Sequence, residues 1–414
     1  MAPLVLPIRI TLNDAIHDVG HLVLNDDAGR TTMAFRYSPY WLENGFALGA
    51  DVPLVEGVIY PRKDDLTADS GVFGFVRDAA PAQTSERLFE TAHLNALKSA
   101  QIESEIDSTH LWARDNAQKH RFSAYEFPLT HSFNTLFSFD LKQRKNALNF
   151  VRLLEGLPNA LQKASEAELA TLTAGVFPLP GRRPKALVTY GADRATYVLR
   201  VRNRTDDYNV PLWTQVTQTL AAACDLTVLP SCYEPIGTDG VHLEPRFDRS
   251  GDKRLFCLSA RTLCRRDPER HTPLSYLDVA DVINAEGVRP KRDLKELFGR
   301  MVFDCLTGNV HNRPENIWFY RANGGWNLAP LSAPRVSPTL IRTRLLPIAL
   351  NGNDTVADTE TAILLASYFG LRKSDAKQMV IGMQKTLYRW KDVAVRLGAD
   401  PIQINRMASS FNQE

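Results

Sequence analysis

The stretch GNVHNRPENIWFYRANGGWNLAPLSAP, from Gly308 to Pro334, consists of a polar loop followed by two short apolar runs. It comes directly after Asp293 to Leu306, a segment in which apolar residues recur at helical spacing on one face. Gly308 and Asn309 both tolerate the left-handed backbone that often ends a helix. The pattern therefore predicts a long amphipathic helix that holds the loop at its end, a usual way to position a functional site.

The overall composition is that of an ordinary globular protein. The 414 residues are 44% hydrophobic and 23% charged, and the length suits two or three domains. A net charge of +2 gives no argument for a nucleic-acid or membrane surface. Because there is no apolar run of about 18 residues and no signal peptide, we expect a cytoplasmic protein. The five cysteines form no CxxC pair, which favours buried thiols over disulfides or a zinc site.

The predicted elements divide the chain into residues 1–140, 141–260 and 261–414. In the first part, strands are predicted at Val5–Leu12, Val19–Leu24 and Thr31–Arg36, and helices at Tyr37–Gly45 and Thr84–Lys98. In the second, helices are predicted within Leu141–Ala167 and from Pro211 to about Ala223, and strands at Ala186–Tyr190, Thr196–Val201, Thr227–Tyr233, Val241–Phe247 and Arg254–Leu258.

The third part is predicted to be mainly helical, with further helices at Ser275–Asn284, Thr359–Tyr368 and Ala376–Leu397. A β-rich N-terminal subdomain thus precedes a small β lobe and a large helical C-terminal lobe. This is an α+β, two-lobed arrangement with the outline of a protein kinase, although such an outline does not by itself give function.

Several motifs occur in an order that resembles the HipA family of bacterial serine/threonine kinase toxins from toxin–antitoxin systems. The N-terminal part contains VGHL, FRYSPYWLENG and RDAAP, which look like the family's small subdomain. Further along, GRRPKALV at Gly181–Val188 is similar to a Gly-Ala-Arg-Pro-Lys loop, and PRFDR at Pro245–Arg249 matches an Arg-Phe-Asp-Arg signature. NLAPLSAP at Asn327–Pro334 stands where the family has Leu-Ala-Pro-Leu-Tyr-Asp. The resemblance covers most of the chain.

The resemblance implies a phosphoryl-transfer centre with a catalytic Asp, two magnesium ligands and a phosphate-binding Lys. The family's loop reads approximately Gly-Asn-Thr-Asp-Asp-His-x-x-Asn, whereas this chain reads GNVHNRPEN. His311 therefore takes the catalytic Asp position, and only Asn316 matches a magnesium ligand. The second magnesium ligand corresponds to Ala333, whose methyl group cannot bind a metal. Arg200 takes the Lys position, and the Glu that pairs with this Lys corresponds to Thr214.

Other residues near these motifs have two interpretations each. Gly181, Arg182, Arg183 and Lys185 form either a basic loop that binds an anion or phosphate, or a solvated turn. His311 is either a general base or, as we favour, a loop residue bonded to backbone or to Asn312. Glu315 and Asp304 either offer a carboxylate to a metal or take no part in metal binding. In the second interpretation Glu315 is a solvated surface charge, and Asp304 contacts Arg300 on the polar side of the helix.

These observations favour a pseudokinase whose fold is retained for protein binding. Its partner would be an antitoxin-like helix-turn-helix protein or an active kinase of the same family. The alternative is an unconventional ATP-dependent serine/threonine kinase that uses His311, Asn316 and Glu315. The lost Asp positions argue against ATP and magnesium as cofactors and leave Asn316 as a vestigial metal ligand. The chain contains no helix-turn-helix motif, so we expect no direct sequence-specific DNA binding. Because it has no long apolar run, we also expect no membrane partner.

Overall fold

A computed structural model describes most of the chain. The described residues are 3–12, 15–27, 30–61, 71–79, 125–126, 137–157, 165, 168, 172, 183–192, 194–250, 253–264, 273–309, 311–338 and 343–411. The chain forms two compact units. Unit 1 comprises Met1–Arg204 and Asp248–Leu258, and unit 2 comprises Thr205–Phe247 and Ser259–Glu414. The three-part division at residues 140 and 260 stays a prediction.

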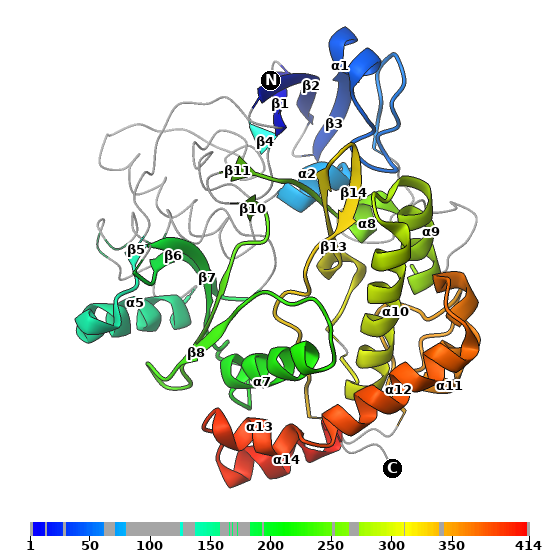
Figure 1. Ribbon diagram of the computed structural model, residues 1–414. Helices are drawn as coiled ribbons and strands as arrows, with labels where there is room; N and C mark the ends of the chain where they lie inside the picture. Colours follow the sequence, from blue (N-terminus) through cyan, green and yellow to red (C-terminus); the bar gives the residue numbers. More distant parts are fainter. Residues whose placement is uncertain are drawn as a thin grey trace. The chain divides into compact units, whose positions relative to one another are not determined.

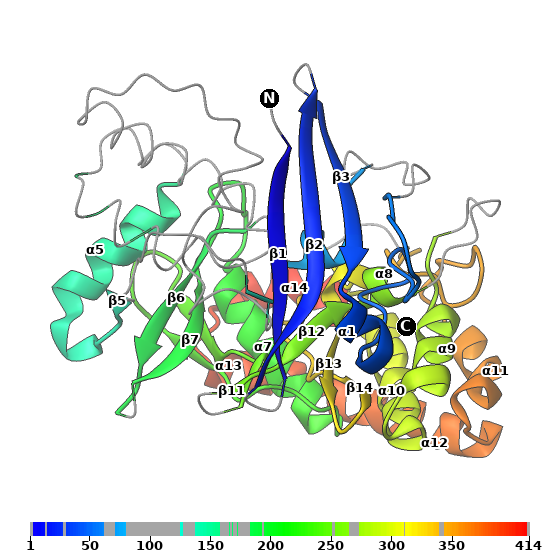
Figure 2. The ribbon, with the colours of Figure 1, turned by 90° about the horizontal axis from the view of Figure 1, so that it is seen from above.

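The first part of unit 1 is a four-stranded antiparallel sheet in the order β3-β2-β1-β4 (Figure 2). Its strands are β1 (Leu4–Leu12), β2 (Ala15–Asp27), β3 (Arg30–Tyr37) and the short β4 (Tyr125–Glu126). The register places Leu6 opposite Leu22 and Leu22 opposite Phe35, and all three side chains are buried. The three predicted strands are confirmed, because their alternating apolar residues give the sheet one buried face.

Helix α1 (Pro39–Asn44) follows β3 and confirms the helix predicted at Tyr37–Gly45. The Ser38 hydroxyl accepts the Trp41 N–H at 3.1 Å and so caps the first turn. Gly45 ends the helix, and a Cβ at this position would lie 2.5 Å from the Trp41 ring, so no larger residue fits without movement. A second short helix, α2 (Gly74–Ala79), follows. The helix predicted at Thr84–Lys98 lies outside the described residues.

The rest of unit 1 combines one helix with short strands. Strand β5 (Phe137–Ser138) runs parallel to β6 (Lys185–Tyr190), which is antiparallel to β7 (Ala195–Arg200). The turn η2 (Leu141–Gln143) leads into α5 (Arg144–Glu155), which confirms the first half of the predicted helical segment. The hairpin of β10 (Arg249–Ser250) and β11 (Lys253–Arg254) precedes β12 (Phe256–Ser259).

Unit 2 begins with α7 (Val210–Ala223) and the antiparallel pair of β8 (Cys232–Glu234) and β9 (Val241–Pro245). The strand predicted at Thr227–Tyr233 is wrong over most of its length. The Thr227 N–H bonds to the Glu296 carboxylate at 3.1 Å, and Val228 makes only an isolated bridge to Leu331. Pro230, which has no N–H, then separates these residues from β8.

The helical part of unit 2 is built around α10 (Pro290–Thr307), with α9 (Tyr276–Glu286) beside it (Figure 1). The shorter elements of this part are α8 (Ala260–Leu263), η4 (Pro314–Asn316), and the hairpin of β13 (Trp318–Ala322) and β14 (Gly325–Leu328). Residues 297–309 of α10 and its cap are all buried. The predicted one-sided helix is therefore covered on every side along its second half, and its polar residues there need internal partners.

The last helices are α11 (Thr359–Leu364), η5 (Ala366–Phe369), α12 (Lys373–Leu387), α13 (Trp390–Arg396) and α14 (Pro401–Phe411). The prediction of one helix from Ala376 to Leu397 is wrong, because the chain breaks between α12 and α13. The break turns the Trp390 ring inward, where it stacks on Phe411 at 4.9 Å and lies 6.1 Å from Trp213. Met383 and Leu387 are buried as predicted for a core face.

All five cysteines are free thiols, of which four are buried and Cys232 is partly exposed. Among the helices that the structure describes, none combines the length and apolarity needed to cross a membrane.

Candidate functional site

Helix α10 ends at Gly308, which has the left-handed backbone expected of a helix cap, with φ 57° and ψ 46°. A Cβ at this position would also lie 2.3 Å from Cδ of Arg344. Glycine is therefore required here both by the backbone conformation and by the close approach of a side chain. The Asn309 N–H bonds to the Asp304 carbonyl at 3.2 Å, so the loop leaves the helix in one fixed direction.

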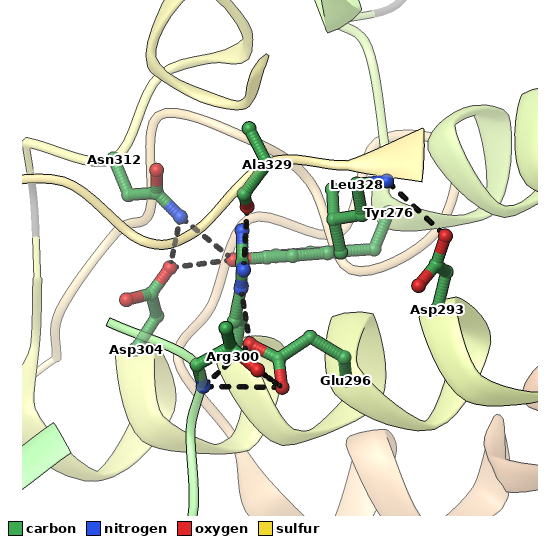
Figure 3. Close-up of polar contacts among 9 residues, drawn as sticks. Tyr276, Asp293, Glu296, Arg300, Asp304, Asn312, Leu328 and Ala329 are labelled. Carbon is green, nitrogen blue, oxygen red and sulfur yellow. Dashed lines mark hydrogen bonds and ion pairs between the residues drawn. The ribbon is translucent and has the colours of Figure 1, made fainter. Parts of the chain in front are cut away.

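The Asp304 carboxylate anchors the loop from inside the protein (Figure 3). It is 1% exposed and accepts hydrogen bonds from the Tyr276 hydroxyl at 2.5 Å, from Asn309 Nδ2 at 3.0 Å and from Asn312 Nδ2. Burial raises the pKa of Asp304 from 3.8 to about 6, although the three donors oppose this change. Arg300 acts on Asp304 as predicted, since its charge lowers the pKa of the carboxyl, but the predicted polar helix face is wrong because residues 297–309 are all buried.

His311 belongs to a directed chain of hydrogen bonds. Arg335 Nη2 lies 2.5 Å from His311 Nδ1, and a guanidinium only donates, so Nδ1 is the acceptor nitrogen. The imidazole proton is therefore on Nε2, which donates to Ser337 Oγ at 2.6 Å. The Tyr208 hydroxyl donates to the Val336 carbonyl at 3.0 Å and hence accepts from Ser337 at 2.9 Å. We call these four side chains the relay.

The relay decides what His311 can do chemically. Both imidazole nitrogens are engaged, one accepting from Arg335 and one donating to Ser337. No lone pair on the ring faces a substrate hydroxyl in this arrangement, and a general base needs one. The prediction for His311 was a bond to backbone or to Asn312, whereas Arg335 and Ser337 of a later segment bond its two ring nitrogens. Sequence spacing could not show this, because Ser337 is far from His311 along the chain.

Asn316 and Glu315 lie on η4, at the end of the loop. The Asn316 side chain is exposed, and its Nδ2 donates to the His311 carbonyl at 2.8 Å, so these two predicted residues are brought together. Glu315 forms an ion pair with Arg261 at 3.0 Å, and its side chain is 40% exposed. The prediction of a merely solvated charge at Glu315 is therefore wrong, because a largely buried arginine holds the carboxylate.

Ala333 lies in a turn that is held by a carboxylate from β9. Glu244 is 1% exposed, and its two oxygens accept from the Ser332 hydroxyl and from the Ala333 N–H, the latter at 3.2 Å. Gln218 of α7 donates to Glu244 at 3.4 Å and meets His242 at 3.1 Å. Ala333 itself has φ 43°, a left-handed conformation that non-glycine residues rarely adopt. Sequence reasoning missed Glu244, which lies within a predicted strand and outside the family motifs, so no local pattern indicated where its side chain points.

The apolar segment before this turn is fixed to α10 (Figure 3). Arg300 donates to the Ala329 carbonyl at 2.8 Å and pairs with Glu296 at 2.8 Å. The Leu328 N–H donates to the Asp293 carboxylate at 3.1 Å, and burial raises the pKa of Asp293. Two polar residues of the helix, Asp293 and Arg300, thus hold adjacent backbone groups of Leu328 and Ala329 inside the NLAPLSAP motif.

The predicted basic residues of the small lobe belong to unit 1. Lys185 and Arg200 are opposite each other in the antiparallel register of β6 and β7, and both are partly exposed. Arg183 precedes β6 and is also partly exposed, whereas Gly181 and Arg182 lie outside the described residues. Thr214, predicted at the position of the pairing Glu, bonds to the Val210 carbonyl of its own helix at 2.8 Å.

Comparison with known proteins identifies the family. Residues 177–409, more than half of the chain, match the family model described as the HipA-like C-terminal domain. The chain belongs to the HipA family. A solved structure of HipA with HipB and its operator DNA, from a Shewanella oneidensis MR-1 toxin–antitoxin system, has a TM-score of 0.57 at 14% identity. The similarity covers 97% of this chain and 94% of the Shewanella HipA chain, and it confirms the α+β, kinase-like fold class.

The other comparisons add little. The proinflammatory kinase CtkA of Helicobacter pylori gives a TM-score of 0.39 at 11% identity, over 56% of this chain and 90% of that one. A search of curated proteins found no match.

Magnesium demands oxygen ligands in near-octahedral geometry, so the state of the described oxygen donors around the loop after α10 matters. Ala333 supplies no oxygen from its side chain. The carboxylates of Asp304 and Glu244 are buried and accept from protein donors, and Glu315 is paired with an arginine. The side chain of Asn316, which was predicted as a vestigial metal ligand, is exposed. Across the described residues, no three His, Cys, Asp or Glu side chains gather into a group that could hold a metal.

Proposed function

We propose that this HipA-family protein is a pseudokinase that acts by binding another protein. The observation that carries the proposal is that the three described carboxylates named above, those of Asp304, Glu244 and Glu315, are already engaged by protein donors. Asp304 serves the loop itself, Glu244 holds the turn at Ala333, and Glu315 pairs with Arg261. A metal would have to displace these contacts before it could bind, and the remaining ligand, Asn316, is a neutral amide.

The rival function, an unconventional kinase that uses His311, Asn316 and Glu315, lacks support on the same grounds. His311 donates from Nε2 and accepts at Nδ1, so it would have to break the relay to act as a base. Phosphoryl transfer also depends on cations or positioned donors that stabilise charge on the transferred group. Loss of a single such donor costs about 2.7–4 kcal/mol of transition-state stabilisation in comparable sites, and several positions are changed here.

The partner follows from the family by analogy. The similar Shewanella HipA was solved together with HipB and its operator DNA. We propose that this chain binds either an antitoxin-like helix-turn-helix protein or an active HipA-family kinase, and that any contact with DNA is made through such a partner. The ordered hydrogen bonds around Arg300 and Asp304, beside the changed catalytic positions, fit a fold kept for binding.

The magnesium dependence of nucleotide binding tests the loss of the metal site. Thermal unfolding of the protein with ATP and Mg²⁺ is compared with unfolding in ATP and EDTA, for the wild type and for Asn316→Ala. We expect identical curves with and without metal. A ligand at one hundred times its Kd adds about 2.7 kcal/mol. Stabilisation of this size that requires Mg²⁺ and disappears in Asn316→Ala would contradict the proposal.

Partner binding is tested separately by size-exclusion chromatography. The protein is mixed with an active HipA-family kinase, or with a helix-turn-helix protein encoded beside its own gene. We expect a stable complex with one of them that persists in Asn316→Ala, because binding does not use the former metal ligand. Elution of both proteins at their separate masses would leave the binding role without support.

A further inference from the structure

Arg344 contacts the C-terminal ends of two helices. Its Nη1 donates to the Ser410 carbonyl of α14 at 3.0 Å, and its Nη2 donates to the Ser409 carbonyl. Both carbonyls belong to residues 408–411, the last turn of α14, where a helix supplies no donor of its own. The same side chain lies against Gly308, the cap of α10, because a Cβ there would meet Arg344 Nη1 at 2.6 Å. One guanidinium therefore joins the end of α14 to the start of the loop after α10.

A second contact joins the last turn of α14, which we call the terminal turn, to the relay. The Ser410 hydroxyl donates to the Ser337 carbonyl at 2.7 Å, and Ser410 is 1% exposed. The Ser337 hydroxyl in turn accepts from His311 Nε2 at 2.6 Å. The backbone of Ser337 is thus held by α14, while its side chain orients His311.

Other parts of α14, which lies beside α13 (Figure 1), are attached elsewhere. The Phe411 ring stacks on Trp390 of α13 and lies 6.2 Å from the Trp213 ring of α7. Trp213 Nε1 donates to Gln403 Oε1 at 3.1 Å, near the start of α14. Among the described contacts, those of Arg344 and Ser410 lead to the loop, whereas that of Gln403 leads to α7.

We infer that α14 is a conformational switch for the loop after α10: docking of the terminal turn fixes the loop, and its detachment releases it. Coupling between segments is carried by packed side chains and hydrogen bonds, and Arg344 and Ser337 provide two such connections side by side. Chain ends are also among the parts of a protein that open at the lowest free energy. Binding of a partner to α14 that lifts this turn therefore changes the orientation of His311 and the relay.

Hydrogen–deuterium exchange, followed by mass spectrometry on the full chain, tests the coupling. Ser410→Ala removes the hydroxyl that donates to Ser337. Arg344→Met removes both donors to α14 and keeps an unbranched side chain beside Gly308. In each variant we expect the amides of residues 309–316 to exchange at least about fivefold faster than in the wild type, because a lost hydrogen bond lowers the free energy of local opening.

The matched control for these two variants is Gln403→Met in the same helix. It removes the bond to Trp213 and leaves the contacts of the terminal turn in place. We expect exchange in its loop to stay within about twofold of the wild type, as for an independent site. The hairpin of β13 and β14 is the internal reference that separates local opening from general unfolding.

Coupling between two segments is reciprocal, so a change beside the loop must also reach α14. Gly308→Ala pushes a methyl group into the Arg344 side chain, and we expect faster exchange in the terminal turn. The matched control is Gly370→Ala. Gly370 has a similar left-handed backbone, with φ 69°, but a methyl group there would meet nothing within 4 Å. The control therefore introduces backbone strain without the push on Arg344.

Two results overturn the inference. One is a loop that exchanges as in the wild type in both Ser410→Ala and Arg344→Met. The other is a control with the same effect as the variant it matches, either Gln403→Met on the loop or Gly370→Ala on the terminal turn.

Native-state exchange of the wild type in low concentrations of urea decides the question if the variants do not fold. Segments that open as one unit share a free energy of opening and its dependence on urea. We expect the loop and the terminal turn to open as one such unit, at less urea than the hairpin of β13 and β14. Separate openings of the loop and the terminal turn would overturn the inference. Magnesium-dependent nucleotide binding would contradict the pseudokinase proposal and leave these results unchanged, so the two proposals fail independently.

Discussion

The buried carboxylate of Asp304 makes the stability of this protein depend on pH in a direction opposite to that of most acidic residues. Its pKa is raised from 3.8 to about 6, with burial as the largest cause. Between these two values the folded protein holds a proton at Asp304 that the unfolded chain has released. The free energy of unfolding from this group therefore falls as the pH rises through that window, and it is constant above the folded-state pKa.

The size of the effect follows from the pKa difference. A difference of about two pH units, at 1.36 kcal/mol each, corresponds to about 3 kcal/mol between pH 4 and pH 7. The perturbation is Asp304→Asn, which removes the titration but keeps the side-chain shape. The amide cannot accept all three donors as the carboxylate does, so the absolute stability of the variant is not diagnostic. The informative quantity is the difference between wild type and variant as a function of pH.

Urea unfolding at several pH values from 4 to 8 measures this difference. We expect wild-type stability to fall relative to Asp304→Asn by about 3 kcal/mol up to pH 7, and to level off above it. The control is Asp375→Asn on α12. Asp375 is exposed and its pKa is lowered by a hydrogen bond from Arg372, so its slope has the opposite sign. If the free energy of unfolding of the wild type, relative to that of Asp304→Asn, stays constant or rises with pH, this expectation is refuted.

Three other substitutions test the packing around the site. Arg300→Ala leaves Glu296 without its largely buried partner, and we expect a loss of about 3–5 kcal/mol in the free energy of unfolding; a loss below about 1 kcal/mol would contradict this. Ala333→Gly removes the strain of a left-handed alanine and should raise the free energy of unfolding by about 0.5–1 kcal/mol, whereas a decrease would argue against strain. Trp213→Ala removes a fully buried ring and should cost about 3–5 kcal/mol, with the change in tryptophan fluorescence as a second readout; wild-type stability would show that this aromatic cluster is not part of the core.

Local patterns predicted the fold well where neighbouring residues decide the structure. The spacing of apolar residues predicted α10, and Gly308 predicted its end, because helix periodicity and caps depend on a few adjacent residues. The strands β1, β2 and β3 were predicted from their alternation for the same reason. The long helix from Ala376 was predicted without its break, because the burial of Trp390 against rings from two other helices decides it.

The candidate site was predicted only in part. The family pattern pointed to His311, Asn316 and Ala333. Asp304 holds the loop that carries the first two, and Glu244 holds the turn at Ala333. The partners that define its chemistry come from distant segments: Arg335 and Ser337 for His311, and Glu244 for Ala333. No periodicity or motif encodes these contacts, because they depend on where tertiary packing brings the loop. Asp304 was predicted on a polar face of α10, because the sequence could not show that the second half of this helix is buried on all sides.

We propose that the HipA fold of this chain no longer transfers phosphate. The most direct measurement incubates the purified protein with radiolabelled ATP and Mg²⁺, alone and with a generic protein substrate, next to Asn316→Ala and an active HipA-family kinase. We predict no more label on any protein than Asn316→Ala gives, while the active kinase labels its substrate. Magnesium-dependent labelling by the wild type that is abolished in Asn316→Ala would contradict the claim.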